Sequence, residues 1–158
     1  MCGRYTSTQP LDLILELFLI DEVRPEVMEL YQPRYNVEPR QRVLVIGARD
    51  GTRIAAMHRW GLIPHWAKDP SIGSRMINAR SETVHERPAY RDAFRRRRCL
   101  IPADGLYEWK RNGRTKQPYR FTLRSGQPFA FAGLWEEWKA PDGTAIRSCT
   151  ILTTQPNE

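Results

Sequence analysis

Apolar side chains recur at helical spacing in one early segment of the chain. Leucine, isoleucine and phenylalanine repeat every three to four residues over 11–20, directly after Pro10, and this period predicts an amphipathic helix. A second helix is expected near Tyr90–Arg97. The stretch from Pro25 to Pro39 is rich in proline and polar residues, and its part from residue 31 onward is expected to be an ordered loop.

Short apolar runs separated by turn residues predict strands. The runs 42–47 and 52–60 flank Arg49-Asp50-Gly51, and an Asp-Gly pair in that position is a strong hairpin signal. Further strands are expected at Arg98–Ile101, Tyr119–Leu123, Phe129–Trp135 and Ser148–Thr153, with turns at Ser125-Gly126 and Pro141-Asp142-Gly143. This pattern predicts an α+β fold in which strongly curved, mostly antiparallel sheets form a barrel-like core with a few flanking helices.

Length and composition indicate a single domain and an anionic partner. The chain has 158 residues, enough for a single domain over 1–158, and because it ends directly after a predicted strand we expect a C-terminal truncation. No apolar run approaches the roughly 18 residues of a membrane span, and no secretory signal is present, so a cytoplasmic location is expected, on the nucleoid in a bacterium. Lys and Arg outnumber Asp and Glu by 25 to 18, which favours nucleic acid as partner. Nothing indicates assembly, and we expect a monomer.

The cysteines and histidines show no spacing typical of a metal site or a disulfide framework. They are Cys2, Cys99, Cys149, His58, His65 and His85. We therefore expect no metal and no other cofactor, and we expect His65 and His85 to be surface residues.

Cys2 is the sharpest chemical feature of the sequence. Removal of Met1 would leave an α-amine and a thiol on one residue, with ordinary pKa values near 7.7 to 8.0 and near 8.5. Such a 1,2-aminothiol condenses with aldehydes, because the amine forms a Schiff base and the thiol closes a thiazolidine ring. The thiol alone is also a candidate nucleophile for acyl transfer. The plain alternative is a small residue that merely permits methionine removal.

Two polar segments could assist such chemistry. Glu108 lies between Tyr107 and Trp109 at an expected strand-to-turn junction, where aromatic walls favour a general acid or base; the alternative is a surface carboxylate paired with a neighbouring Lys or Arg. Asn78 and Arg80 share one face if their segment is extended, an arrangement that suits a phosphate or sugar oxygen or, alternatively, caps a loop.

Two further features fit a nucleic-acid partner. Trp66, in the rigid segment 60–66, could stack on an unpaired base, although core packing is the default for a tryptophan. The run Arg95-Arg96-Arg97-Arg98 either tracks a phosphate backbone or forms a solvated face.

Seven segments together resemble the SOS response-associated peptidase (SRAP) family, in the family's order and across essentially the whole chain. They are Met1-Cys-Gly-Arg-Tyr, Pro33-Arg-Tyr-Asn-Val-Glu-Pro, Trp60-Gly-Leu-Ile-Pro-His-Trp, Asn78-Ala-Arg-Ser-Glu-Thr, Cys99-Leu-Ile-Pro-Ala-Asp-Gly-Leu-Tyr-Glu-Trp-Lys, Gln117-Pro-Tyr and Phe131-Ala-Gly-Leu-Trp. Each segment alone is weakly specific, but the ordered set is highly specific.

The resemblance implies a sensor of abasic sites in single-stranded DNA, with a possible preference for junctions between single and double strands. It implies covalent capture through Cys2, which shields the lesion from strand cleavage, with proton transfer by Glu108 and orientation of the cysteine and lesion by Asn78. It further implies DNA contacts from Arg4, Arg80, Trp66 and Trp109. The family also has a histidine in a His-Asp-Arg-Met-Pro motif after Thr-Thr-x-Pro-Asn, and the sequence stops before that motif.

Two other functions remain open at this stage. A cysteine peptidase would use Cys2 against a peptide bond, above all its own Met1-Cys2 bond, although the sequence shows no clear base and oxyanion hole. A basic domain could also bind single-stranded DNA or RNA without any covalent step. If Met1 is retained, the α-nitrogen of Cys2 is part of a peptide bond and no Schiff base can form there.

Overall fold

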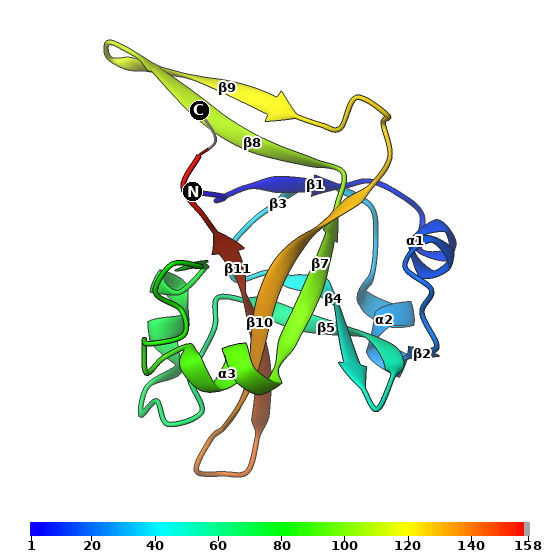
Figure 1. Cartoon of the computed structure of the whole chain (residues 1–158), viewed down its shortest axis with the longest axis vertical. Coiled ribbons are helices and arrows are strands. Elements are labelled where there is room, and N and C mark those ends of the chain that lie inside the picture. The colour runs from blue at the N-terminus through cyan, green and yellow to red at the C-terminus, as the bar shows by residue number, and fades with distance from the viewer. Residues whose placement is uncertain (157–158) are drawn as a thin grey trace.

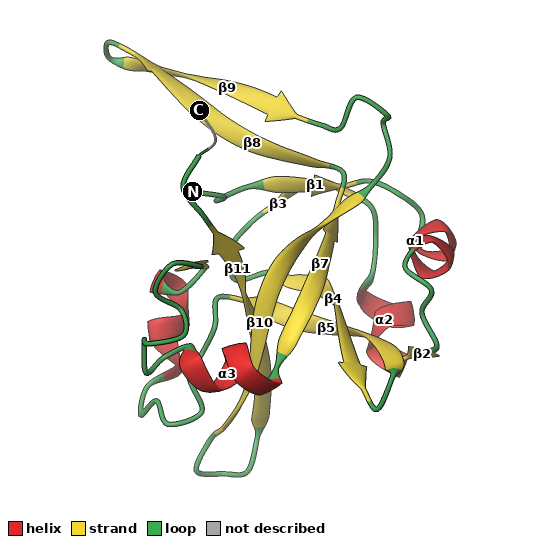
Figure 2. Ribbon diagram, in the orientation of Figure 1, coloured by secondary structure: helices red, strands yellow, loops and turns green. Residues whose placement is uncertain are grey.

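Five strands close into a barrel in the computed structural model, which describes residues 1–156 (Figure 1 and Figure 2). The strands are β1 (Tyr5–Ser7), β2 (Glu22–Val23), β3 (Arg34–Val37), β4 (Arg42–Arg49), β5 (Thr52–Trp60), β6 (Asn78–Arg80), β7 (Arg98–Ala103), β8 (Gly105–Asn112), β9 (Thr115–Phe121), β10 (Phe129–Lys139) and β11 (Ala145–Thr153). The helices are α1 (Leu11–Leu17), α2 (Pro25–Leu30), α3 (Arg91–Arg96) and a 3-10 helix over Pro70–Arg75.

The barrel runs in the order β5, β4, β7, β10 and β11, and it closes where β11 pairs with β5. The four pairings within that series are antiparallel, whereas the closing pair is parallel. A second, antiparallel sheet has the order β3-β1-β8-β9 and crosses one end of the barrel (Figure 1). The mixed fold with few helices and a curved, mostly antiparallel core confirms the predicted class.

The main core fills the barrel and reaches into the second sheet. Tyr5 of β1 is buried there and packs edge-on against Trp60 and Phe131. A second cluster lies under α1 and α2, where Ile14 and Val27 are buried against β4 and β5. The first residues of the chain are therefore joined to the barrel core.

The Asp50-Gly51 hairpin confirms its sequence signal. Both residues adopt positive φ, 49° and 79°, and Arg49 pairs with Thr52 across the turn. Positive φ at both central positions defines the type I′ turn, which Asp-Gly sequences favour. The turn at Gly126 and a second helix near residue 90 are also confirmed, the helix as α3.

Several predicted boundaries are wrong. The first helix ends at Leu17, because Leu19 adopts a positive φ of 52° and reverses the chain before residue 20. The expected loop over 31–39 contains β3, which pairs with β1. Helix α2 was not predicted; Pro25 occupies its first turn, where no hydrogen-bonded N–H is needed. These elements are short and show no long apolar period.

The predicted strand limits also shift. The strand from Arg98 extends to Ala103, and the strand predicted over 119–123 runs instead over 115–121, as the return arm of the hairpin formed with β8. Strand β8 itself was not predicted, because its outer half is exposed and, apart from Trp109, polar. The last two strands are longer than predicted, at Phe129–Lys139 and Ala145–Thr153.

Candidate functional site

The register of the second sheet places Glu108 beside the start of the chain. Tyr5 of β1 pairs with Leu106 of β8, and the Tyr107 N–H donates to the Arg4 carbonyl at 3.0 Å. Continuing this antiparallel register brings Glu108 opposite the residues that precede β1. The amino group of Met1 accordingly lies 3.5 Å from Oε1 of Glu108.

The environment of Glu108 differs from the one predicted. It lies within β8 and not at a strand end, and the rings of Tyr107 and Trp109 are 6.3 Å apart as a neighbouring pair. Because successive side chains of a strand point to opposite faces, these rings lie on the face away from the Glu108 carboxylate. The carboxylate is 44% exposed, and its ion partner is the chain terminus, not a Lys or Arg.

Asn78 also binds the start of the chain. Strand β6 pairs in parallel with the end of β11, where Ile151 is the partner of Asn78. The segment is therefore extended, which is the condition under which Asn78 and Arg80 share one face. The Asn78 Nδ2 donates a hydrogen bond of 3.0 Å to the carbonyl oxygen of Cys2. The Asn78 Oδ1 is buried and has no hydrogen-bond partner within residues 1–156, so the amide retains a free acceptor beside Cys2.

The Cys2 thiol is buried, with the residue 7% exposed, and its Sγ lies 3.9 Å from the carbonyl oxygen of Arg4. Burial, reinforced by the negative charge of Glu108, raises the pKa of this thiol to about 11. The thiol is therefore protonated at neutral pH, and it reacts as a thiol or after losing a proton to a base. Cys99 and Cys149 are also free and buried.

Arg80 and Trp66 line a cavity next to Asn78. The cavity has a volume of about 490 Å³, and an adjoining cavity of about 200 Å³ is lined by Arg80 together with Met1. Trp66 is 52% exposed, so the default of core packing is wrong for this residue. A basic and aromatic surface thus leads to the chain terminus.

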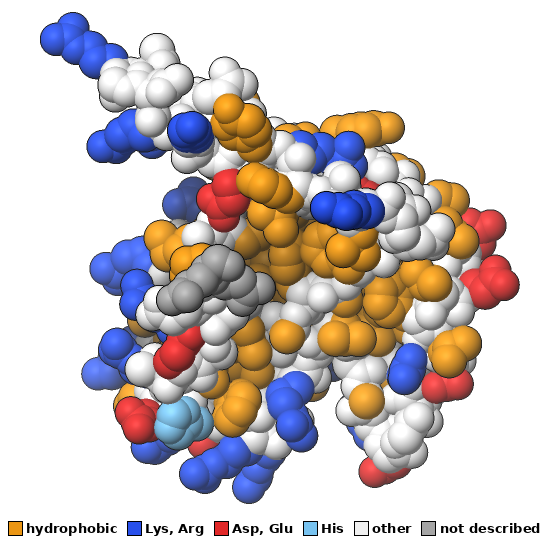
Figure 3. Space-filling model, turned by 45° about the horizontal axis from the view of Figure 1, so that its top comes forward, with side chains coloured by type: hydrophobic (Ala, Val, Ile, Leu, Met, Phe, Trp, Pro, Cys, Tyr) orange, Lys and Arg blue, Asp and Glu red, His pale blue; other side chains and the backbone are white. Residues whose placement is uncertain are grey.

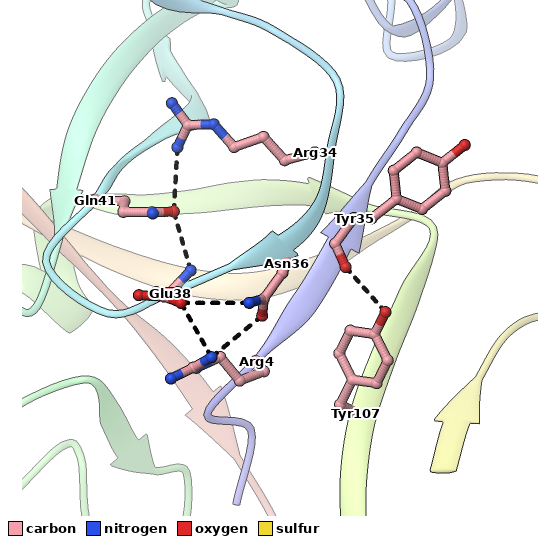
Figure 4. A network of polar contacts seen from close by, with 7 residues as sticks. All are labelled: Arg4, Arg34, Tyr35, Asn36, Glu38, Gln41 and Tyr107. Carbon is pink, nitrogen blue, oxygen red and sulfur yellow. Dashed lines mark hydrogen bonds and ion pairs between the residues drawn. The ribbon is translucent and has the colours of Figure 1, made fainter. Parts of the chain in front are cut away.

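Arg4 is tied into a local polar network rather than extended toward solvent. Its Nη1 donates to Glu38 Oε1 at 3.1 Å and to Asn36 Oδ1 at 3.3 Å, and Gln41 joins the same network (Figure 4). The pairing of β1 with β3 creates this contact, and no local sequence signal indicates it. Arg4 would have to leave Glu38, or share it, to contact DNA.

Trp109 lies on the hairpin of β8 and β9, which projects from the body of the protein (Figure 1). It is 44% exposed, and Lys and Arg side chains surround the projecting hairpin (Figure 3). Aromatic rings interleaved with cations are typical of surfaces that bind single strands. Trp109 and Trp66 come from separate segments of the chain.

The remaining candidates lie away from the terminus. In the arginine run, Arg97 is half-buried and pairs with Glu136, while its three neighbours are exposed. His65 and His85 are both exposed, as predicted, and the Nδ1 of His65 also lies 2.9 Å from Glu136 Oε2. Within residues 1–156, no three Asp, Glu, His or Cys side chains gather as a metal site.

The family model for SOS response associated peptidase (SRAP) matches residues 1–158. The chain belongs to the SRAP family. The SRAP segments are therefore those that build the site: the Met1-Cys2 terminus, the β6 segment with Asn78 and Arg80, and β8 with Glu108.

Several SRAP relatives have names that refer to abasic sites. The abasic site processing protein YoqW of Bacillus subtilis is 51% identical over 161 residues, which cover 100% of this chain and 70% of that protein. The abasic site processing protein YedK of Escherichia coli is 32% identical over 136 residues, which cover 85% of this chain and 59% of that protein.

Solved structures share the SRAP fold. A protein from Bordetella bronchiseptica matches with a TM-score of 0.79 at 28% identity, covering 99% of this chain and 74% of that chain. A protein from Bacteroides thetaiotaomicron matches with a TM-score of 0.90 at 24% identity, covering 99% and 69%. No helix within residues 1–156 has the length and apolar character to cross a bilayer.

Proposed function

We propose that this chain processes abasic sites in single-stranded DNA by forming a covalent crosslink through Cys2 after removal of Met1. One observation carries the proposal: the start of the chain is held between the Asn78 amide, 3.0 Å from the Cys2 carbonyl oxygen, and the Glu108 carboxylate, 3.5 Å from the Met1 amino group. The names of the SRAP relatives support the abasic site as substrate.

In the proposed reaction the nitrogen and the sulfur of Cys2 both bond to one carbon of the abasic site. The ring-opened deoxyribose of an abasic site has an aldehyde at C1′, which the α-amine of Cys2 attacks. Loss of one water forms the C=N bond of a Schiff base. The Cys2 sulfur then bonds to the same carbon while its proton passes to the nitrogen, which closes a thiazolidine ring. No oxidant or cofactor is required, and the product mass equals the two reactants minus one water.

The protein residues supply proton transfer and position. We assign to Glu108 the roles of general base and acid, in which it accepts the proton of the attacking amine and returns it to the departing hydroxyl group. Its 3.5 Å contact with the Met1 amino group and its effect on the pKa of the Cys2 thiol support this assignment. The raised pKa of the buried Cys2 thiol, about 11, keeps the sulfur protonated, so we expect the amine to react first. Asn78 fixes the backbone of Cys2, and its unpaired Oδ1 is available to a hydroxyl group of the sugar.

The surface around the terminus suits a single strand. Arg80 lines both cavities at the terminus, and it suits a backbone phosphate close to the aldehyde. Trp66 and Trp109 are exposed aromatic rings for the bases beside the lesion. We assign Arg4 to the DNA surface as well, with its Glu38 partner as the competitor that a phosphate must displace.

Intact mass spectrometry tests the proposal. The full chain, freed of Met1, is incubated with a single-stranded oligonucleotide that contains one abasic site, and in parallel with an undamaged strand. We expect an adduct of the two masses minus one water with the abasic strand only. Cys2→Ala should bind the strand without forming this adduct. A heat-stable adduct from Cys2→Ala would refute the mechanism, and binding without any adduct from the unaltered protein would favour a non-covalent single-strand binder.

A second candidate activity concerns Met1 itself. The ion pair between the Met1 amino group and Glu108 places the Met1-Cys2 bond beside a carboxylate and a thiol. That arrangement favours removal of Met1 by the protein's own residues, a peptidase step that precedes capture. The products of this hydrolysis are free methionine and the Cys2 α-amine, with one water consumed.

A further inference from the structure

Two adjoining cavities lie at the side of the barrel formed by the end of β4, the second half of β10 and the start of β11. Their volumes are about 630 Å³ and about 70 Å³, and they share the lining residues Arg49, Trp135 and Arg147. Neither cavity is lined by the terminus, Asn78 or Glu108. The second sheet, with the Cys2 site, crosses the opposite end of the barrel (Figure 1).

Arginine side chains dominate the walls of these cavities. The smaller cavity is lined by Arg24, Arg49 and Arg147 and by no carboxylate. The larger one adds two arginines of the run at the end of α3, and Lys and Arg side chains gather beside a notch at the lower edge of Figure 3. Arg24 pairs with Glu22 at 3.3 Å and Arg147 pairs with Glu137 at 2.9 Å, so Arg49 is the lining arginine of the smaller cavity without an ion pair among the described residues.

The carboxylates that line the larger cavity already have partners. Glu136 is bound by Arg97 and by the backbone N–H and Nδ1 of His65, and it is 3% exposed. Glu137 accepts from Arg147 Nε at 2.9 Å, and the third lining carboxylate, Asp92, lies 3.9 Å from Arg91 Nε. Arg49, in contrast, is exposed at the end of β4 without an ion pair among the described residues. The cavities therefore retain positive charge that the protein itself does not neutralise.

Two buried polar atoms at the cavity walls have no partner within residues 1–156. They are His58 Nδ1 and Arg97 Nε. His58 is 4% exposed, lines the smaller cavity, and lies against Trp135 with a ring distance of 5.5 Å. Buried polar atoms in native proteins almost always have a hydrogen-bond partner, so unpaired atoms at a cavity indicate a ligand or water that supplies one.

We propose that these cavities form a second binding site, specific for a phosphate monoester: the terminal phosphate of a nucleotide or of a DNA strand end. The planar guanidinium group binds two phosphate oxygens at once, and Arg24, Arg49 and Arg147 suit a dianionic group better than a singly charged carboxylate. The larger cavity has the volume of a typical small-molecule site and holds the attached nucleoside.

The site is independent of the capture reaction. No residue that lines the phosphate site also lines the cavity at Met1, and its arginines come from β4, β11, the loop before α2 and the end of α3 rather than from β1, β6 or β8. Variants that lose the phosphate site should crosslink to abasic DNA as the unaltered protein does. Failure of the phosphate site and failure of the capture mechanism are thus separate results.

Nuclear magnetic resonance titration of the full chain tests the proposal at the site itself. The indole N–H of Trp135, identified by comparison with Trp135→Phe, reports on the cavity because its Nε1 faces Gly47 at the wall. The probes are inorganic phosphate, deoxyadenosine 5′-monophosphate, and one tetranucleotide with and without a 5′-phosphate. We expect saturable shifts of the Trp135 signal with the nucleotide or the phosphorylated tetranucleotide, and none with the 5′-hydroxyl strand.

Matched arginine variants separate this site from general attraction to a basic protein. Arg49→Ala with Arg147→Ala removes two lining charges, and Arg75→Ala with Arg124→Ala removes two exposed charges elsewhere. We expect about tenfold weaker binding from the first pair and little change from the second. Arg49→Ala alone should weaken binding with the fold intact.

The probes also identify the source of the phosphate. A response to the mononucleotide alone assigns the site to a free nucleotide, and a response to the phosphorylated tetranucleotide assigns it to a strand end. Equal effects of the two variant pairs, equal responses to both tetranucleotides, or a Trp135 signal that does not move would overturn the proposal.

Discussion

The Asn78 side-chain amide donates a 3.0 Å hydrogen bond to the carbonyl oxygen of Cys2, across 76 residues of sequence. Asn78→Ala and Asn78→Asp both remove this donor. A hydrogen bond of this kind contributes about 1 kcal/mol, so the rate of crosslink formation should fall by about fivefold or more. DNA affinity should fall less than the rate, since this bond holds the reacting residue, and the Oδ1 proposed for the sugar hydroxyl is one of several contacts to the strand.

Single-turnover capture rates and fluorescence anisotropy on the same oligonucleotide measure the two effects separately. Asn112→Ala, in the exposed hairpin end, is the matched control for a lost amide. Equal capture rates for Asn78→Ala and the control would show that Asn78 does not position Cys2.

Glu108 should slow the reaction of the Cys2 thiol with a simple alkylating reagent. Its carboxylate, after burial, is the second cause that raises the pKa of this thiol to about 11. Glu108→Gln removes that charge, lowers the thiol pKa and should increase alkylation by iodoacetamide at pH 8 about threefold. Peptide mass mapping follows Cys2 separately from the two buried cysteines. Glu38→Gln, a lost carboxylate bound to Arg4, should leave the rate unchanged; a decrease for Glu108→Gln would contradict the charge effect.

Removal of Met1 should depend on Glu108 if the protein processes its own terminus. The chain and its Glu108→Ala variant are produced in a translation system that lacks methionine aminopeptidase. We expect the unaltered chain to lose Met1 and the variant to retain it, because the Met1 amino group loses its partner 3.5 Å away. Intact mass gives the answer directly. Equal loss of Met1 from both proteins would exclude processing that depends on Glu108.

Arg80 should contribute one phosphate contact to DNA binding. It is exposed and lines both cavities at the terminus. Arg80→Ala should weaken binding of single strands and reduce the slope of log affinity against log salt by about one, with no effect on thermal stability. Titrations at several salt concentrations measure that slope, and Arg95→Ala provides an exposed arginine outside these cavities. An unchanged slope for Arg80→Ala would remove Arg80 from the interface.

His58 should make the fold sensitive to acid. Burial and the nearby Arg147 lower its pKa from 6.5 to about 4. Between these values the unfolded chain binds a proton that the folded protein does not, so stability decreases as the pH falls from 6.5 toward 4. The loss due to His58 is about 2 kcal/mol at pH 5.

Urea unfolding at pH 7 and pH 5 tests this sensitivity. The stability of His58→Gln should change less between the two pH values than that of the unaltered protein. His85→Gln, which alters a half-exposed histidine, should behave as the unaltered protein does. The same pH dependence in all three proteins would assign the acid sensitivity to other groups.

Sequence patterns predicted the elements whose signals are local. Asp50 and Gly51 specify their turn by their own backbone preferences, and the long apolar runs specify the barrel strands. Strand β3 and the outer part of β8 lacked such signals, since their pairing partners and not their own side chains make them strands. Helix α2 has six residues and shows no apolar period, and the acceptance of Pro25 in its first turn is not by itself a helix signal.

The candidate site shows the same difference between local signals and long-range pairing. Cys2, Asn78 and Glu108 were predicted from their chemistry and from the family segments, and the structure brings all three to the terminus. The binding of Arg4 by Glu38 depends on the pairing of β1 with β3 and could not be predicted locally. The arginine-lined cavities were likewise hidden, because their residues come from strands far apart in sequence.

The short strand β1 lies in the middle of its sheet, between β3 and β8, although it is the first strand made during synthesis. The ribosome must release β8 before β1 has both neighbours and before Glu108 can reach the terminus. Such non-local pairing forms slowly. If removal of Met1 depends on Glu108, the α-nitrogen of Cys2 stays in a peptide bond until β8 has paired with β1. The unfolded chain would then be unable to close a ring with cellular aldehydes, and folding itself would control when the reactive amine is exposed.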